Sequence, residues 1–128
     1  MNIRIFKHYI RSWLTKDLDL FLSVLTENVQ ITECYGAQYL GKKECKKWFS
    51  HWFSSLENQV IAWEIHTQES SGEYGFFTWK FECVYNNEHT IFDGISRVKF
   101  KGDLICEIYE FEMTHKKQRP YSLKKKKQ

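Results

Sequence analysis

The sequence predicts an α+β domain in which helices pack on one face of a curved, mainly antiparallel sheet. In the N-terminal part, apolar side chains recur every three or four positions, as in amphipathic helices, whereas from Val60 onward they alternate with polar ones, as in strands. The 128 residues are 42% hydrophobic and 17% aromatic, which is enough for one packed core. We therefore expect one domain over residues 1–114 and a basic, partly disordered tail over residues 115–128.

Two helices are expected at the start of the chain. The apolar stripe of the first is formed by Ile3, Phe6, Ile10 and Trp13. Tyr9 falls at the border of this stripe. A second, short helix follows, and Asp17 is a suitable N-cap because its carboxylate can accept hydrogen bonds from backbone N–H groups. Its buried side is predicted to hold Leu18, Phe21, Leu22 and Leu25.

A strand is expected over residues 29–35, followed by a turn or short hairpin in the stretch YGAQYLG. Gly41 with Glu44 three residues later resembles the start of a third helix. The buried face of this helix is strongly aromatic and consists of Trp48, Phe49, Trp52 and Phe53.

Four long strands complete the domain, over about residues 60–69, 74–86, 89–101 and 104–114. The turn sequences SSGE, NNE and KGD separate them, so consecutive strands form an antiparallel meander. In the last strand Tyr109, Phe111 and Met113 lie on one side and Ile108 on the other, so both sheet faces carry apolar side chains. We therefore expect a homodimer through the face that the helices leave open.

The net charge of +3 hides an uneven distribution. Residues 115–128 hold seven of the 19 Lys and Arg and none of the 16 Asp and Glu, which leaves the rest of the chain at −4. A mildly acidic domain is not typical of proteins that bind the phosphate backbone, so nucleic acid is not an expected partner. The terminal LKKKKQ is either a solvated tail or a contact for an acidic surface.

Cysteine and histidine spacing gives no support to disulfides or metal sites. The four cysteines form no CxxC pair, and the five histidines show no HxH, HxxxH or HExxH spacing. The start, MNIRIFKHYIRSW, alternates charged and apolar residues, and no stretch approaches the roughly 18 apolar residues of a membrane span. We expect a soluble, cytoplasmic protein with no metal, no cofactor and no membrane partner.

Glu33 stands out because strand alternation puts it on the same face as Val29, Ile31 and Tyr35. Three interpretations follow. The carboxylate has a structural role, paired with a buried cation or hydrogen-bonded to His8 or a Trp indole. Alternatively it contacts a ligand, or it is a catalytic base whose pKa an apolar pocket raises.

Several stretches resemble the nuclear transport factor 2-like superfamily, and within it the SnoaL-like and ketosteroid-isomerase-like branch. They are YIRSWLTKDLDLFLSVLTENVQITE, the YxG turn at Tyr39–Gly41 leading into a Trp-rich helix, FDGIS at 92–96, and KGDLICEIYEFE running towards PY at 120 and 121. The resemblance covers nearly the whole chain. It implies a cone-shaped fold whose helices close over a concave sheet and leave an apolar internal pocket.

In ketosteroid isomerases that pocket holds a carboxylate base at the end of the first strand, a tyrosine donor on the first helix and a protonated aspartic acid on a later strand. The resemblance places Tyr9 at the tyrosine and Glu33 at the carboxylate, since both pairs are separated by the same 24 residues. Ser96 of FDGIS stands at the third position. Serine donates hydrogen bonds but lacks the acidity of a neutral carboxylic acid, so this departure puts steroid isomerisation itself in doubt.

Strand parity directs a group of mostly aromatic residues towards the helices, where each fits either the core or a pocket wall. The predicted ligand-binding residues are Tyr35, Trp48, Trp52, Trp63, Trp79, Phe81, Phe92, Ile108 and Glu110. Glu110 either rims the pocket mouth or pairs with a surface Lys or Arg. Tyr9 is either a packed helix residue or a donor to substrate, and Gly94 within a strand indicates a bulge.

The sequence thus supports two hypotheses of function. In the first, the protein binds an apolar or aromatic small molecule, and Glu33 is the general base or acid of a cofactor-free isomerase or cyclase with Tyr9 and Ser96 as hydrogen-bond donors. In the second, it is a non-catalytic ligand-binding or protein-interaction module of the same fold. Whether it is an enzyme stays open at this stage.

Overall fold

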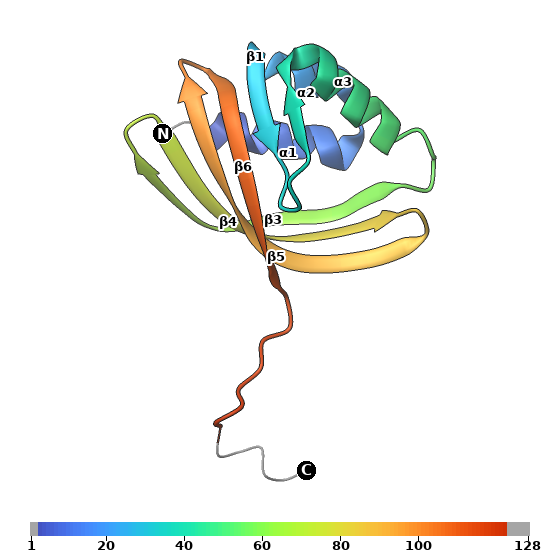
Figure 1. Ribbon diagram of the computed structural model, residues 1–128, viewed down its shortest axis with the longest axis vertical. Coiled ribbons are helices and arrows are strands. Elements are labelled where there is room, and N and C mark those ends of the chain that lie inside the picture. Colours follow the sequence, from blue (N-terminus) through green and yellow to red (C-terminus); the bar gives the residue numbers. More distant parts are fainter. Residues whose placement is uncertain (1–2, 123–128) are drawn as a thin grey trace.

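The computed structural model describes residues 3–122 and shows three helices on the concave side of one curved sheet (Figure 1). Six strands form this sheet in the order β2-β1-β6-β5-β4-β3. The predicted α+β class is therefore confirmed. The terminal LKKKKQ lies outside the described residues. Within residues 3–122, no helix has the length and apolar composition needed to cross a membrane.

Helices α1 (Ile3–Thr15) and α2 (Leu18–Ser23) form where the apolar spacing predicts them. Tyr9 is 1% exposed, so it lies in the middle of the buried face of α1 and not at its border. The Asp17 carboxylate accepts a hydrogen bond from the Leu20 N–H at 3.0 Å, which confirms it as the N-cap of α2. The prediction that Leu25 belongs to this helix is wrong. Leu25 begins the next strand, because the Val24 carbonyl already accepts a hydrogen bond from the Ile105 N–H at 2.8 Å.

Strand β1 (Leu25–Thr32) starts earlier and ends earlier than the predicted strand over 29–35. After Thr32 the chain reverses: the Glu33 N–H donates to the Ala37 carbonyl at 2.8 Å, and the Gly36 N–H donates to the Glu33 carbonyl at 2.9 Å. Strand β2 (Gln38–Leu40) then pairs antiparallel with β1. The stretch YGAQYLG is thus a short hairpin, and Glu33 stands in its loop directly after the strand.

Helix α3 (Gly41–Trp52) begins at the predicted glycine. The Glu44 carboxylate reaches back and accepts a hydrogen bond from the Leu40 N–H at 2.8 Å, which ties the helix start to β2. Its aromatic face packs on the first two helices, with Phe49 stacked on Phe21 and close to Trp13. This packing closes one end of the concave face.

The meander consists of β3 (Gln59–Ser71), β4 (Tyr74–Tyr85), β5 (Glu88–Lys101) and β6 (Leu104–Thr114), each antiparallel to the next. These bounds lie within two residues of the predicted ones. The β4–β5 turn has positive φ at both Asn86 and Asn87, as a two-residue type I′ turn requires. Strand β6 runs parallel to β1, which brings the end of β1 beside the middle of β6, where Thr32 pairs with Tyr109.

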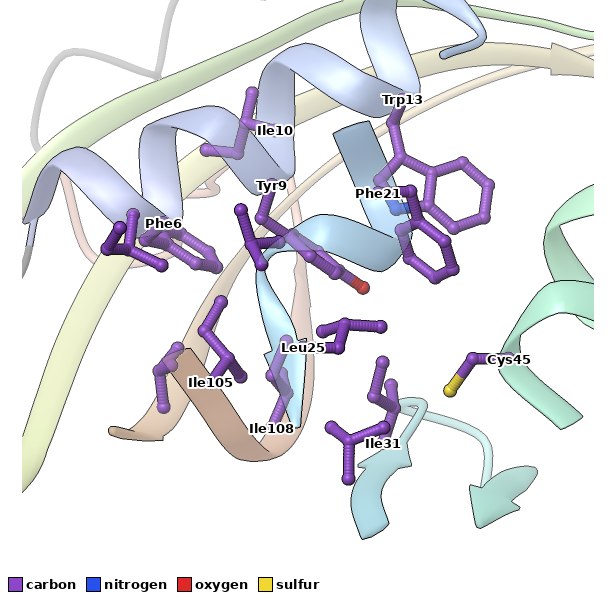
Figure 2. Close-up of a cluster of buried hydrophobic side chains, with 14 of the residues drawn as sticks. Phe6, Tyr9, Ile10, Trp13, Phe21, Leu25, Ile31, Cys45, Ile105 and Ile108 are labelled. Carbon is purple, nitrogen blue, oxygen red and sulfur yellow. The ribbon is translucent and has the colours of Figure 1, made fainter. Parts of the chain in front are cut away.

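The core fills the space between α1 and the β1–β6 pair. Figure 2 shows Phe6, Tyr9 and Trp13 extending from α1 towards Leu25 and Ile31 of β1. Ile105 and Ile108 of β6 close the same cluster from below, and both are fully buried. The opposite face of the sheet bears no helix and exposes apolar side chains near the end of β6, where Phe111 is 54% and Met113 59% exposed.

Candidate functional site

An internal cavity of about 320 Å³, which opens to solvent beside the exposed Tyr35, lies between the helices and the sheet. Residues of α1, the β1–β2 hairpin, α3 and strands β3 to β6 line it. The predicted site residues found in this lining are Tyr9, Glu33, Tyr35, Trp48, Trp52, Trp63, Trp79, Phe81, Phe92 and Glu110. A volume of this size falls in the range of small-molecule sites.

Glu33 reaches the cavity because the parity of β1, with Val29 and Ile31 fully buried, continues into the first loop residue. The Tyr39 hydroxyl donates a hydrogen bond of 2.7 Å to Glu33 Oε1. Burial raises the pKa of the Glu33 carboxyl, and the hydroxyls of Tyr39 and Tyr35 act in the opposite direction by stabilising the charged form. Glu33 is therefore an oriented and partly desolvated carboxyl group.

Tyr9 enters the cavity from α1, and its hydroxyl oxygen points away from the helix into the interior (Figure 2). Burial raises the pKa of this hydroxyl well above its usual value, and the charges of Glu110 and Glu33 add to the effect. The Trp13 indole N–H lies near enough to lower the pKa slightly, but it lacks hydrogen-bond geometry. Tyr9 thus keeps its proton and can act only as a neutral hydrogen-bond donor or acceptor.

Glu110 is the second carboxyl group in the cavity. Its side chain is partly buried and belongs to the cavity lining. Burial raises its pKa to about 8, with the charge of Glu33 as the next cause. The parallel pairing of β1 with β6 brings the two glutamates to the same cavity, and Glu110 is mostly protonated at neutral pH.

Ser96 does not line the cavity, although the sequence predicts it as a donor to substrate. It is fully buried and stands directly opposite Glu110 across the β5–β6 pair. Its Oγ accepts a hydrogen bond of 2.9 Å from the Trp79 indole and donates one of 3.4 Å to Glu110 Oε2. The structure therefore places Ser96 behind Glu110. Ile108 is likewise fully buried outside the lining, because it packs in the core where β6 meets β1.

Gly94 allows this chain of hydrogen bonds to form. A Cβ atom at position 94 would lie 2.4 Å from Cη2 of Trp79 and 2.4 Å from the Phe111 carbonyl oxygen. The predicted bulge at Gly94 is wrong, since β5 pairs in regular register with both neighbours at this point. The glycine is needed because the Trp79 ring lies against the β5 backbone.

Aromatic rings form most of the remaining wall. Beside Glu33, the Tyr39 and Trp48 rings stack with centroids 4.2 Å apart. On the sheet, Trp79 and Phe81 flank Phe92 at centroid distances of 6.0 Å and 5.2 Å. These rings contact one another and present apolar surface to an occupant of the cavity.

Sequence reasoning missed Tyr39 as a site residue and undervalued Glu110. Tyr39 belongs to the YxG motif, which was interpreted as a turn, and only the hairpin shows that its hydroxyl meets Glu33. Glu110 had a usable signal, since it alternates in phase with Ile108 on the inner face of β6. The cavity also takes in Cys34 and His51, which the sequence did not single out.

A second hollow, of about 330 Å³, lies on the outer side of α1 against β3. Lys7, Trp63 and His66 are among its lining residues, and no carboxyl group is. It lacks the carboxyl groups and the aromatic wall of the internal cavity, which is therefore the candidate site. Across residues 3–122, no group of three or more His, Cys, Asp or Glu is arranged to hold a metal ion.

The family of this chain follows from a match to the SnoaL-like domain over residues 6–108. The chain belongs to the SnoaL-like domain family. This agrees with the helix-covered curved sheet and with the resemblance seen in the sequence. Among curated protein sequences, none matches significantly.

Solved structures of the same fold are numerous and distant in sequence. An epoxide hydrolase of the LEH-like type from M. tuberculosis superimposes with a TM-score of 0.77 at 10% identity, over 88% of this chain and 82% of that one. A protein with a ketosteroid isomerase-like fold from Catenulispora acidiphila, solved with trimethylamine, gives 0.74 at 10% identity, over 87% and 86%. A protein assigned to the SnoaL-like polyketide cyclases of Shewanella putrefaciens gives 0.73 at 7% identity, over 87% and 88%. At these identities the likeness extends to the fold.

Proposed function

We propose that the internal cavity binds an apolar or aromatic small molecule and that Glu33 transfers a proton to or from it. The observation that carries this proposal is a partly desolvated carboxyl group, oriented by the Tyr39 hydroxyl, at the wall of an aromatic cavity that Tyr9 also lines. The fold relatives include a hydrolase and a protein assigned as a cyclase, so the fold can support catalysis on small molecules.

The chemistry would be a cofactor-free isomerisation or cyclisation. Glu33 removes a proton from a carbon next to a carbonyl, and the electron pair moves to the carbonyl oxygen, where the Tyr9 hydroxyl donates a hydrogen bond to the enolate. Glu33 then returns the proton to a different carbon. In a cyclisation, the enolate carbon instead attacks a second carbonyl of the same molecule, the C=O electron pair moves to its oxygen, and that oxygen takes the proton back from Glu33. Ser96 contributes through Glu110, which it contacts directly.

Binding of 2-naphthol, a flat phenol that mimics an enolate, tests the site. Saturable binding followed by tryptophan fluorescence is expected for the wild type. Its pH dependence should reflect both cavity glutamates, and Glu33→Gln should remove the part due to Glu33 and leave that of Glu110. Absence of binding to the folded wild-type protein would refute the proposal.

Proton transfer itself can be measured with a bicyclic ketone. Wild-type protein is expected to accelerate deuterium exchange at the carbon next to the carbonyl of 1-tetralone in D₂O, followed by NMR. Glu33→Gln is expected to lose this acceleration while it still binds the ketone. Binding without acceleration in the wild type would instead identify a non-catalytic ligand-binding module.

We further propose a homodimer through the helix-free face of the sheet and a cytoplasmic location. The exposed Phe111 and Met113 side chains support the first. The free thiols of all four cysteines support the second, since reduced cysteines are the rule in reducing compartments.

A further inference from the structure

The cavity contains two acidic side chains and no strong base among the residues that line it. Glu33 and Glu110 both belong to the lining, whereas no lysine or arginine does, and His51 is its remaining basic side chain. Neither glutamate takes part in the ion pairs formed within residues 3–122. The two cavity carboxyl groups therefore have no counter-ion among the described residues.

The other titratable groups near Glu110 do not supply one. These groups are Tyr9 from α1 and Cys34 and Tyr35 from the hairpin. Burial and the nearby carboxyl groups, Glu110 among them, raise the pKa of all three, to about 12 in the case of Cys34. They are therefore neutral at pH 7. The one hydrogen bond to the Glu110 carboxyl from the described residues is the long one from Ser96 at 3.4 Å, which leaves the other carboxyl oxygen free to meet a ligand.

Aromatic rings surround this acidic pair from three directions. Tyr39 and Trp48 stack on the hairpin and α3 side, Trp79 and Phe92 form the sheet side, and Tyr9 comes from α1. The faces of such rings carry partial negative charge and attract ammonium groups, most strongly where water is excluded. Rings of this kind, next to carboxyl groups, form a site for an organic cation.

We propose that the cavity binds a small organic cation, a molecule with an ammonium group, using Glu33 and Glu110 as counter-ions and the tryptophan and tyrosine rings as walls. The proposal names the class of ligand for the proposed function, and it rests on that function because both require the cavity to be a ligand site. In the free protein the proton on Glu110 takes the place of the cation. The positive charge of a bound ammonium group lowers the pKa of the Glu110 carboxyl, so binding releases this proton.

The same arrangement excludes anions. A phosphate or carboxylate ligand would meet Glu33 in a cavity of about 320 Å³ whose described lining offers no lysine or arginine to pair with it. A cavity of this size accommodates a bicyclic amine. Within the proposed chemistry, the ammonium group would hold the substrate while Glu33 acts on a neighbouring C–H bond.

Three naphthalene derivatives of equal size and different charge test the proposal: 1-naphthylmethylamine, 1-naphthylmethanol and 1-naphthoate. Isothermal titration at pH 7 is expected to show that the ammonium compound binds at least about tenfold more tightly than the alcohol, and that the naphthoate does not bind. Repeating the titration in buffers of different ionisation enthalpy is expected to show release of about one proton with the amine and none with the alcohol.

Glu110→Gln keeps the size of the side chain and removes its charge. It is expected to abolish the proton release and to reduce the preference for the amine, with the affinity for the alcohol unchanged. The matched control is Glu112→Gln, two residues along β6. Glu112 is not among the lining residues, and its carboxylate accepts a hydrogen bond from Cys34, which is. This variant should bind all three compounds as the wild type does.

The outcomes separate this inference from the proposed function. If the alcohol binds as tightly as the amine, or if the amine binds without proton release, the cation site is refuted and the cavity remains a site for neutral molecules. If none of the three compounds binds the folded wild-type protein, the cavity is not a ligand site and the proposed function fails as well. The wild-type series decides these cases even if Glu110→Gln does not fold.

Discussion

Replacing Ser96 with alanine probes the hydrogen bonds that connect the sheet to the candidate site. The Oγ of Ser96 accepts from the Trp79 indole at 2.9 Å, and both side chains are buried. Without this oxygen the indole N–H has no acceptor in a place that water does not reach. An orphaned buried donor costs about 1 to 3 kcal/mol, so the free energy of unfolding of Ser96→Ala should fall by that amount.

Ser12 offers a matched control because it is also fully buried. Its hydroxyl donates to the Tyr9 carbonyl of its own helix at 2.6 Å, and that carbonyl still has a backbone N–H to accept from when the hydroxyl is gone. Ser12→Ala should therefore cost less than about 1 kcal/mol, partly because alanine favours the helix. Urea unfolding followed by circular dichroism measures both values. If the two variants lose the same free energy of unfolding, the Trp79 indole does not depend on Ser96 as its buried hydrogen-bond acceptor.

A second readout of Ser96→Ala concerns Glu110. The hydrogen bond from Ser96 lowers the pKa of the Glu110 carboxyl, which burial and Glu33 otherwise raise to about 8. Its loss should therefore raise that pKa further. A lower pKa would mean that the variant has let water into the cavity, and it would refute the proposed geometry.

Three other predictions follow from the same contacts. Gly94→Ala should lose about 1 to 3 kcal/mol in urea unfolding, because its Cβ would overlap the Trp79 ring and the Phe111 carbonyl; an unchanged stability would show that the ring does not lie there. The stability of the wild type should fall between about pH 4.5 and 8, by up to roughly 1.4 kcal/mol per pH unit, since the folded state keeps the Glu110 proton that the unfolded chain has released. Glu110→Gln should flatten this slope, and a slope unaffected by the change would contradict the raised pKa. Met113→Glu should convert the proposed dimer to monomer in sedimentation velocity without loss of fold, and a dimer that persists would move the interface elsewhere.

Much of the fold could be predicted from local patterns. The period of the apolar residues located every helix and long strand, and the capping side chains of Asp17 and Glu44 marked two helix starts. The ends of β1 could not be predicted in this way, because they depend on a long-range partner. Its start is fixed by pairing with β6, and its end by a hairpin loop whose hydrogen bonds close only between Glu33 and Ala37.

The sequence predicts which residues of the candidate site face inward, but it does not predict the hydrogen bonds and contacts between them. Parity alone put Glu33, Trp79 and Glu110 on the inner face. Parity does not tell which inner residues reach the cavity and which lie beneath it, and so Ser96 and Ile108 were expected in the wall. The two glutamates lie in the same cavity because β1 pairs in parallel with β6, and local sequence patterns do not predict this long-range contact.

Glu110 is expected to keep its proton at neutral pH beside Glu33 in the cavity. A carbon-13 NMR titration of the glutamate carboxyl groups tests it directly, in the wild type and in Glu33→Gln. The structure predicts one glutamate that titrates near pH 8 in the wild type, is absent in Glu110→Gln, and shifts to lower pH in Glu33→Gln because its negative neighbour is gone. If every glutamate of the folded wild-type protein titrates in the usual range near pH 4.5, Glu110 is not desolvated beside Glu33 and the proposed site is wrong.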